Sequence, residues 1–277
     1  MEQRADLHVH THHSDGSLSP AELVERARSV GLDIVGITDH DNINGIAEAL
    51  RAGEEQNVEI IPGVELSAHV DGREVHILGY FIDPENPGLV DFLGFLRKER
   101  VRRAERMVEK LHALNIHLSM EKILEKAGFA SVGRPHIANA IIDEGYTASY
   151  PEVFSKYIGY GCPAYVEKVH CSPEETLSMI TESGGLSFLA HPGTALPEQT
   201  VLQLIKAGLD GIETVHPSHS FETTTHYRGI VHQYYLLESG GSDFHGGRRN
   251  DYAALGNVTI PLAVVETMRR RLIVQDK

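Results

Sequence analysis

Nine side chains that can bind metal ions recur along this sequence, and most of them stand where a hydrophobic segment ends. They are His8, His10, Asp15, His40, Glu65, His76, His191, Asp243 and His245. An apolar segment that ends in a polar residue is typical of a buried strand that places its last residue at a site. Imidazoles and carboxylates together suit divalent ions such as Zn, Mn and Fe. The pattern therefore predicts a hydrolase that uses more than one metal ion.

The composition is that of an ordinary globular protein, with one exception. The 277 residues are 41% apolar and 23% charged, which fits one large α/β domain or one domain carrying an insertion. Histidine is the exception, because 17 His residues stand against 8 Phe and no Trp. Neutral imidazole is a common metal ligand, so this surplus agrees with a metal site.

The net charge and the cysteine content limit the classes of ligand and partner that this protein can have. The formal charge of −14 argues against a broad basic surface for long duplex nucleic acid, but bound cations would still attract phosphate substrates. Cys162 and Cys171 are too few for a disulfide framework and lack zinc-knuckle spacing. We find no signal peptide and no apolar run of membrane length. We expect a cytoplasmic protein with no membrane association and no obligate protein partner.

Strand and helix patterns alternate through most of the chain. The expected strands are 5–10, 33–38, 58–64, 186–190, 211–215 and 236–242. The expected helices between them are 20–30, 46–55 and a capped helix that begins at Ser172-Pro173. Asp71-Gly72 marks a hairpin that brings His76 back toward Glu65. Repeated strand–helix units with polar residues at strand ends predict a parallel α/β barrel whose site lies at that rim.

The pattern changes between residues 97 and 165, where no convincing strand occurs. Helical segments are expected at 89–114, 120–126, 135–143 and 151–157. We interpret 97–165 as an all-helical insertion domain that covers the site, and 1–96 with 166–277 as the barrel domain. The charged run between Arg97 and Arg106 includes Glu99 and Glu105, which is more typical of a solvated helix face than of a nucleic-acid groove.

The nine side chains together indicate a metal site more strongly than any one of them does alone. Alternate residues of a strand share a face, so His8 and His10 can reach one ion. Any one of the nine could instead be a hydrogen-bonded core residue or a helix cap. All nine arising that way is improbable, because a buried cluster of imidazoles and carboxylates without cations is costly to desolvate.

These motifs, in this order, resemble those of the PHP (polymerase and histidinol phosphatase) family. The segments that carry the resemblance span most of the chain outside the helical block; they are His8-Val9-His10, Ser14-Asp15-Gly16, Ile37-Thr38-Asp39-His40-Asp41, Pro62-Gly63-Val64-Glu65, Val75-His76-Ile77-Leu78-Gly79, Ala190-His191-Pro192 and Gly241-Ser242-Asp243-Phe244-His245. The resemblance implies a distorted (β/α)7 barrel that holds two or three divalent ions, most often Mn²⁺, with Fe²⁺ and Zn²⁺ as alternatives.

The resemblance also implies which residues hold which ion. One ion would be bound by His8, His10, Glu65 and Asp243. Glu65 would bridge to a second ion held by His76 and His191, and Asp15, His40 and His245 would hold a third. Ions held in this way would lower the pKa of a bridging water, and the hydroxide would attack a phosphate ester. His191 and Asp243 are the candidates for catalytic proton transfer.

Three further residues are candidates for substrate binding. Arg134 precedes a predicted helix in Gly133-Arg134-Pro135-His136, a stretch similar to one in the PHP subgroup with this insertion. An Arg side chain at a helix N-terminus suits a second phosphate. Lys168 is a weaker candidate for the same anion, and His219 could contact the scissile phosphate. In each case a solvated or packing role is the alternative.

The resemblance implies phosphate release from nucleoside 3′,5′-bisphosphates, removal of nucleotides from the 5′ end of short RNA, or both. We therefore expect a metal-dependent phosphoesterase whose substrate is a small phosphorylated nucleotide or short RNA. One alternative enzyme is histidinol-phosphate phosphatase, against which the helical insertion and the Arg134 segment count. A different alternative is a non-catalytic PHP scaffold module, which the presence of all nine candidate ligands disfavours.

Overall fold

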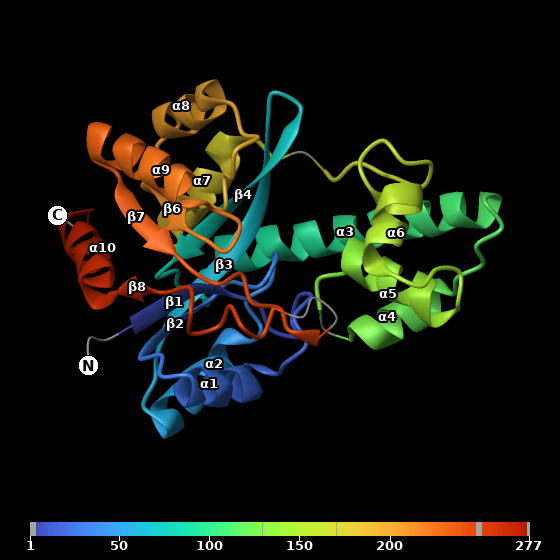
Figure 1. Cartoon of the computed structure of the whole chain (residues 1–277), viewed down its shortest axis with the longest axis horizontal. Helices are drawn as coiled ribbons and strands as arrows, with labels where there is room; N and C mark the ends of the chain where they lie inside the picture. Colours follow the sequence, from blue (N-terminus) through green and yellow to red (C-terminus); the bar gives the residue numbers. More distant parts are fainter. Residues whose placement is uncertain (1–3, 129, 170, 248–250, 276–277) are drawn as a thin grey trace. The chain divides into compact units, whose positions relative to one another are not determined.

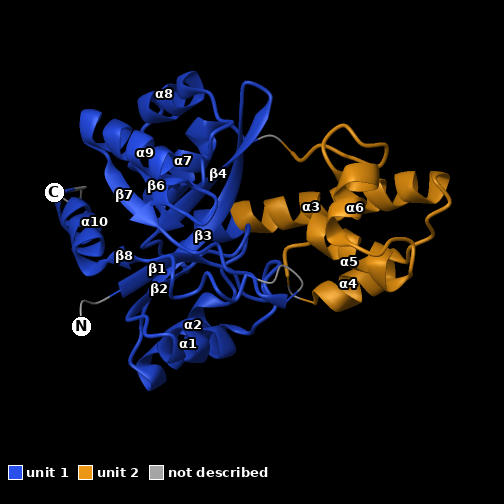
Figure 2. Ribbon diagram, viewed as in Figure 1, with its two compact units in different colours: residues 1–91, 170–277 blue, residues 92–169 orange. Residues whose placement is uncertain are grey.

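The computed structural model describes residues 4–128, 130–169, 171–247 and 251–275. The chain forms two compact units, shown in Figure 2. Unit 1 comprises residues 1–91 and 170–277, and unit 2 comprises residues 92–169. The predicted insertion boundaries, 97 and 165, both lie inside unit 2. Among the described residues no helix combines the length and the apolar character needed to cross a membrane.

Unit 1 is built on one sheet whose strand order is β7-β6-β5-β4-β3-β2-β1-β8 (Figure 1). The strands are β1 (Arg4–Val9), β2 (Ile34–Ile37), β3 (Glu59–Val70), β4 (Arg73–Tyr80), β5 (Leu186–Leu189), β6 (Gly211–Val215), β7 (Leu237–Gly240) and β8 (Ile260–Pro261). The pairs β1–β2, β2–β3, β5–β6 and β6–β7 are parallel. The pairs β3–β4, β4–β5 and β1–β8 are antiparallel. The sheet is therefore mixed, and the prediction of a parallel barrel is wrong at β4 and β8. The strand β4 reverses direction because it follows β3 through a tight hairpin, with no crossover helix between them.

The sheet nearly closes where the chain leaves β7. The His10 backbone N–H donates to the Phe244 carbonyl at 2.9 Å, and Val9 forms a parallel bridge with Phe244. Gly241 allows this approach, because a Cβ there would lie 2.4 Å from the His8 backbone nitrogen. These contacts bring the segment after β7 against the end of β1. The predicted α/β class and distorted barrel are confirmed, with β8 as an added antiparallel edge strand.

Helices of unit 1 pack on the barrel strands. They are α1 (Pro20–Ser29), α2 (Ile46–Gln56), α7 (Pro173–Glu182), α8 (Glu198–Lys206), α9 (Phe221–Gln233) and α10 (Leu262–Gln275). The expected capping of α1 is present, since Glu22 N–H donates to the Ser19 hydroxyl and Ser19 N–H donates to the Glu22 carboxylate. Ser172 and Glu175 make the same reciprocal pair at α7. Local capping thus fixes where the helices after β1 and before β5 begin.

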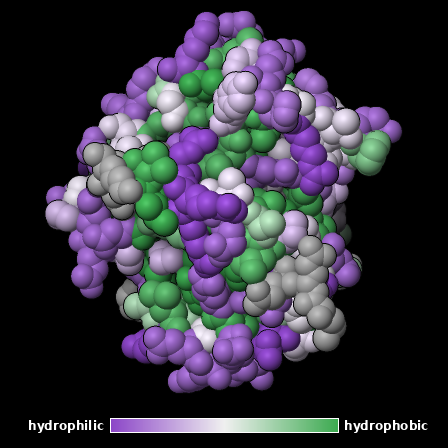
Figure 3. Space-filling view, turned by 90° about the vertical axis from the view of Figure 1, so that its left-hand side faces the viewer, coloured by the Kyte–Doolittle hydropathy of each residue, from purple (hydrophilic) through white to green (hydrophobic). Residues whose placement is uncertain are grey.

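The C-terminal helix α10 has a buried face and an exposed face. Val265 and Met268 are fully buried in the core that also contains Leu7, Leu78 and Phe188 of the strands. Ile273 and Val274, by contrast, are 60% and 70% exposed. Figure 3 draws the side of the molecule on which α10 lies, and hydrophobic residues are exposed there among hydrophilic ones. The helix therefore contributes to the barrel core along only part of its length.

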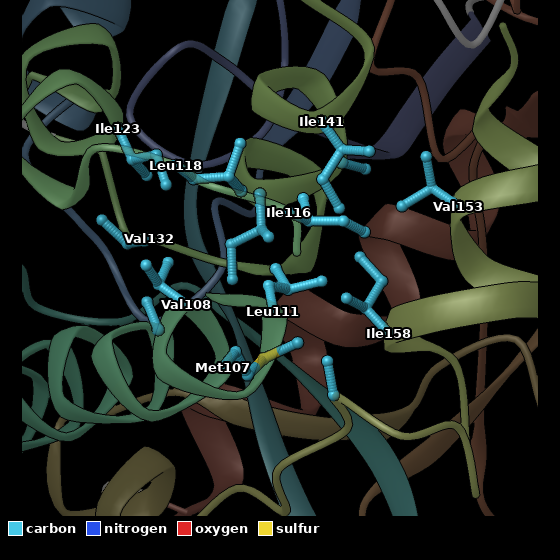
Figure 4. Packing of buried hydrophobic residues seen from close by; sticks show 14 of the residues in the cluster. Met107, Val108, Leu111, Ile116, Leu118, Ile123, Val132, Ile141, Val153 and Ile158 are labelled. Carbon is cyan, nitrogen blue, oxygen red and sulfur yellow. The ribbon is translucent and has the colours of Figure 1, made fainter. Parts of the chain in front are cut away.

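Unit 2 is helical in all its regular elements. They are α3 (Pro87–Ala113), which begins in unit 1, followed by α4 (Met120–Ala127), α5 (Arg134–Asp143), α6 (Tyr150–Val153) and the π-helix η1 (Phe154–Ile158). Their apolar faces meet in one cluster, shown in Figure 4, that includes Met107, Leu111 and Ile116. Ile123, Ile141 and Val153 are part of the same cluster. This core lies within residues 104–166, so the unit buries an apolar cluster of its own.

One strand differs from its sequence-based expectation in a way that matters for the site. The strand expected over 58–64 continues to Val70, so Glu65 lies inside β3 rather than after its end. The extension arises because β3 and β4 form a long hairpin through Asp71-Gly72, in which Glu65 is opposite Leu78 and Ser67 is opposite His76. Opposed residues share a face of the sheet, so Glu65 and His76 are diagonal neighbours.

Candidate metal centre

The carboxyl ends of the parallel strands and the β3–β4 hairpin supply the candidate ligands. His8 is in β1, and His10 follows it. His191, Asp243 and His245 come shortly after β5 and β7. Because β4 runs antiparallel to its neighbours, its N-terminal half lies at the rim where the parallel strands end, and this half carries His76. The topology therefore brings residues from distant parts of the sequence to one end of the barrel.

Glu65 lies among the imidazoles of this cluster. Its side chain is only 1% exposed. Its Oε1 lies 2.7 Å from His76 Nδ1 and 3.1 Å from His191 Nε2. Its Oε2 lies 2.9 Å from His40 Nδ1, 3.4 Å from His10 Nε2 and 3.6 Å from His8 Nε2. A carboxylate whose two oxygens face separate groups of imidazoles has the geometry to bridge two ions.

Asp243 faces the histidines of β1. Its Oδ1 lies 3.3 Å from His8 Nε2 and 3.2 Å from His10 Nε2, and these two nitrogens are 3.1 Å apart. Three ligand atoms from His8, His10 and Asp243 thus come within 4.8 Å of one another. Such convergence is what one shared ion requires.

Three further groups of ligand atoms complete the cluster. Ligand atoms of His10, Asp15, His40 and His245 lie within 4.8 Å of one another, and His245 Nε2 is 3.2 Å from Asp15 Oδ1. The other groups share Glu65; they are His8 with Glu65 and His191, and His40 with Glu65 and His76. All nine predicted ligands therefore belong to overlapping groups at one end of unit 1.

The protonation states at this centre suit cations. Burial opposes ionisation of Glu65, but His40, His76 and His8 outweigh it and hold the pKa of Glu65 well below 4.5. Burial also opposes ionisation of Asp243, and His8 and His245 likewise hold its pKa well below 3.8. Burial lowers the pKa of His40 to about 4 and lowers that of His10. At neutral pH Glu65 and Asp243 are thus charged while His10 and His40 are neutral, which are the forms that bind metal.

His8 is the exception among these groups. Burial opposes its protonation, but the carboxylates of Glu213, Asp243 and Glu65 hold the pKa of His8 well above 6.5. A metal ion that binds His8 must therefore displace a proton, so binding at this residue should weaken as the pH falls.

Buried polar atoms at the centre test whether its residues fit a metal. Glu65 Oε2 and His40 Nδ1 are buried and have no hydrogen-bond partner of acceptable geometry among the described residues, although they lie 2.9 Å apart. Leaving a buried polar atom unsatisfied costs about 1–3 kcal/mol. A divalent cation would satisfy both the carboxylate oxygen and the imidazole lone pair. The donor set of imidazoles and carboxylates fits such ions.

Comparison with known proteins agrees with this geometry. The family model of the PHP domain matches residues 6–150. The chain is 34% identical over 253 residues to a 3′,5′-nucleoside bisphosphate phosphatase from Chromobacterium violaceum, a match that covers 88% of this chain and 89% of the relative. It is also 34% identical to the 5′-3′ exoribonuclease Rnm from Escherichia coli, over 87% of this chain and 84% of the relative. The chain belongs to the PHP family.

A solved structure extends the PHP comparison to the fold. A protein from Bifidobacterium adolescentis, described as a metal-dependent phosphoesterase, superposes with a TM-score of 0.90 at 30% identity, covering 97% of this chain and 96% of that one. The predicted enzyme class, a metal-dependent phosphoesterase, is confirmed. These relatives do not favour histidinol-phosphate phosphatase, and they count against a non-catalytic scaffold.

The structure adds residues to this PHP centre that the sequence did not single out. Glu213 of β6 is fully buried, and its Oε1 lies 2.9 Å from His8 Nδ1. His216 Nε2 lies 3.6 Å from Asp243 Oδ2. The signal in the sequence that could have indicated Glu213 is that an acidic residue stands in the middle of a strand, Gly211–Val215, that is expected to be buried.

Asp39 is another supporting carboxylate of the PHP centre. It accepts hydrogen bonds from the Thr11 backbone N–H at 2.8 Å and the Thr11 hydroxyl at 2.6 Å. It also accepts one from the Ser14 hydroxyl at 2.5 Å, and Ser14 Oγ is 3.3 Å from His10 Nδ1. Asp39 thus ties down the loop between His10 and Asp15. Its place beside His40 in Thr38-Asp39-His40 hinted at a role, although not at this one.

The three predicted substrate-binding residues lie in different surroundings. His219 belongs to unit 1, and both its ring nitrogens face backbone atoms; Nδ1 is 2.9 Å from the Thr214 carbonyl, and Nε2 accepts from Gly193 N–H at 3.1 Å. Arg134 and Lys168 belong to unit 2. The Arg134 guanidinium carbon lies 5.7 Å from the Phe154 ring centre and 5.9 Å from the Tyr165 ring centre. His219 could contact a substrate phosphate directly only by giving up a backbone bond.

Proposed function

We propose that this chain releases phosphate from nucleoside 3′,5′-bisphosphates, removes nucleotides from the 5′ end of short RNA by hydrolysis, or does both. The observation that carries the proposal is the position of Glu65, whose two oxygens face five imidazoles and so suit a bridged pair of ions. The relatives named above support the substrate class, because their printed activities are these two and the chain spans 89% and 84% of their lengths.

The proposed ligand sets are those that the family resemblance implies, and they overlap with the groups of side chains at the rim. His8, His10, Glu65 and Asp243 would hold one ion, and Glu65 would also serve a second ion together with His76 and His191. Asp15, His40 and His245 hold a third. Mn²⁺ is the ion we favour, with Fe²⁺ and Zn²⁺ as alternatives, because a mixture of imidazoles and carboxylates accepts all three.

The metal ions and the protein would contribute differently to the reaction. Bound divalent ions would supply positive charge that attracts a phosphate and lowers the pKa of a water molecule, so that hydroxide is available to attack the phosphate. The side chains of His191 and Asp243 are 27% and 25% exposed, whereas those of His8, His10 and Glu65 are at most 1% exposed. We therefore assign the proton transfers to His191 and Asp243, since these two are accessible to substrate.

The second phosphate of such a substrate needs a cation of its own. Arg134 is the first residue of α5, and the backbone N–H groups of a helix N-terminus favour anions. Phe154 and Tyr165 flank that guanidinium and restrict its orientation. We propose that Arg134 binds the phosphate that is not hydrolysed, with Lys168 as an auxiliary cation. We leave His219 out of the direct contacts because its ring nitrogens are already bonded to the backbone.

The decisive experiment measures phosphate release by the Mn²⁺-loaded protein from adenosine 3′,5′-bisphosphate. A 5′-phosphorylated dinucleotide, AMP and histidinol phosphate are assayed in parallel. We expect turnover of the bisphosphate or the dinucleotide with a kcat/KM well above that for AMP, because AMP lacks the second phosphate. An absence of turnover on both the bisphosphate and the dinucleotide would overturn the substrate assignment.

The role of Arg134 is tested by Arg134→Ala. Because hydrogen bonds to charged groups contribute about 1.5–3 kcal/mol, we expect kcat/KM for the bisphosphate to fall by about tenfold or more. The AMP rate should change much less. Arg102→Ala is the matched control, since Arg102 is in the same unit, is 68% exposed and pairs with Glu99. Equal losses on the bisphosphate and AMP would contradict the assigned role.

A further inference from the structure

Glu213 contacts two of the candidate ligands at once, from a strand that supplies none of them. It lies in β6, between β5 and β7 in the sheet, and its side chain is fully buried. Its Oε1 accepts from His8 Nδ1 at 2.9 Å, and its Oε2 accepts from the His191 backbone N–H at 2.6 Å. Each carboxylate oxygen thus meets a different ligand residue, and the two residues are far apart in the sequence.

The bond to His8 determines which ring nitrogen is available. A carboxylate can only accept, so the Nδ1 that faces Glu213 carries a hydrogen. When a metal ion displaces the other proton of His8, Nε2 presents its lone pair on the side of Asp243 Oδ1, 3.3 Å away, and His10 Nε2, 3.1 Å away. A carboxylate behind a ligating histidine fixes both the tautomer and the ring orientation in this way.

The bond to His191 acts on the backbone. His191 has φ of +26°, outside the regions that residues other than glycine usually adopt, and it follows β5 by two residues. Such a conformation persists only where the surroundings hold it. The short hydrogen bond from the His191 N–H to Glu213 is one such constraint. In this conformation His191 Nε2 lies 3.1 Å from Glu65 Oε1.

We infer that Glu213 is a positioning residue of the metal centre, which fixes the His8 tautomer and holds the His191 turn so that both imidazoles face the ions. The inference depends on the proposed metal centre but not on the substrate. A competing account makes Glu213 only the buried counter-charge of His8. Under that account, removal of the charge lowers stability without changing how tightly the folded protein binds metal.

The experiment measures metal binding without substrate. Glu213→Gln and Glu213→Ala are titrated with Mn²⁺ and, separately, Zn²⁺ in competition with a chelator, and bound metal is counted by elemental analysis. Outer-shell partners of ligating histidines contribute about 10–100-fold in metal affinity, so we expect Glu213→Ala to lose affinity within that range. Glu213→Gln should be intermediate, because its amide oxygen still accepts from His8 but its second atom cannot accept from His191.

Activity gives a second readout. At saturating Mn²⁺ the kcat of Glu213→Gln should recover, while its half-saturating Mn²⁺ concentration stays high. Glu238→Gln is the matched control, because Glu238 lies on the adjacent strand β7 and bonds Thr214 and Arg228 instead of the ligands. This control should bind Mn²⁺ like the parent.

Circular dichroism and the melting temperature establish whether each variant is folded. If Glu213→Ala does not fold, the metal titration of Glu213→Gln alone tests the inference. Parental metal affinity and stoichiometry in the folded variants would overturn the inference, even where the melting temperature has fallen. That result would leave the bisphosphate assay untouched. Conversely, inactivity of the parent on nucleotides would not alter the titration, so the two proposals fail separately.

Discussion

The metal centre of unit 1 and the apolar cluster of unit 2 bury opposite kinds of side chain. In unit 1 the carboxylates of Glu65 and Glu213 and the ring of His8 are at most 1% exposed. In unit 2 the buried cluster is apolar and includes Met107 and Leu111. Apolar burial contributes to stability without a partner, whereas a buried charge must find one. The barrel rim is therefore organised around binding, and the helical cluster around packing.

The same contrast predicts different responses to substitution. The groups at the rim share partners, because Glu65 alone faces five imidazoles. Residues in one such network act together, so the effects of single changes should not add. In the helical cluster each side chain contributes its own buried area, and the effect of a change should stay local.

The largest effect is expected from Glu65→Gln. The amide keeps the shape of the side chain but removes its charge, and it turns one acceptor into a donor facing imidazole nitrogens. Outer-shell partners alone are worth about 10–100-fold, so we expect this change to lower phosphoesterase activity by more than about 100-fold. Bound Mn²⁺, counted by elemental analysis, should fall as well. Full metal content with normal activity would refute the view that Glu65 organises the rim.

A smaller effect, of a different kind, is expected from Leu111→Ala in unit 2. Leu111 is fully buried in the apolar cluster. Truncation of a buried leucine costs about 2–5 kcal/mol, which urea unfolding would measure as a loss in the free energy of unfolding. Metal content of the folded protein should not change.

Leu114→Ala is the control for this prediction, because Leu114 is 39% exposed and directly follows the end of the same helix. It should have a much smaller effect on the unfolding free energy. A loss of bound metal in folded Leu111→Ala would show that the two kinds of core are not independent.

The smallest effect concerns pH. Burial raises the pKa of Asp6 in β1 from 3.8 to about 7. The stability contributed by protonated Asp6 is therefore fully present below pH 3.8 and is lost as the pH rises through 7, at up to about 1.4 kcal/mol per pH unit. Asp6→Asn removes this term while its amide oxygen can still accept from His8 and Ser242 N–H.

The measurement compares urea unfolding of metal-free parent and Asp6→Asn between pH 5 and pH 8. The difference in unfolding free energy should shift in favour of Asp6→Asn as the pH rises. Parallel curves would mean that Asp6 is ionised throughout this range. The comparison isolates Asp6 because the other titrating groups are common to both proteins.

Much of the architecture was predictable because its signals are local. Ser19 and Glu22 set the start of α1 through bonds three residues apart. The hydrophobic runs of β2 and β5 end close to the residues that they position. The helical character of residues 97–165 was predictable from periodicity in the same way. Such signals need no knowledge of the rest of the chain.

Other features were not predictable because they depend on distant pairing. The extension of β3 past Glu65 depends on its register with β4. The sequence shows Glu213 only as an acid within a strand, and its contact with His8 Nδ1 at 2.9 Å exists only because β6 pairs with its neighbours in the sheet. The hydrogen bonds of the His219 ring to Thr214 and Gly193 also depend on the fold, and its contact with a phosphate stays a prediction.

By itself the sequence determined which chemistry is available here, because residue type sets which atoms can bind a metal ion and spacing places them at strand ends. Tertiary structure alone decided how those atoms are shared. Distances among Glu65, Asp243 and the histidines, and the bonds that orient His8 and His191, arise from strands that meet only when the barrel closes. The physical reason is that periodicity and capping act over a few residues, whereas ligand geometry depends on side chains from strands far apart in the sequence.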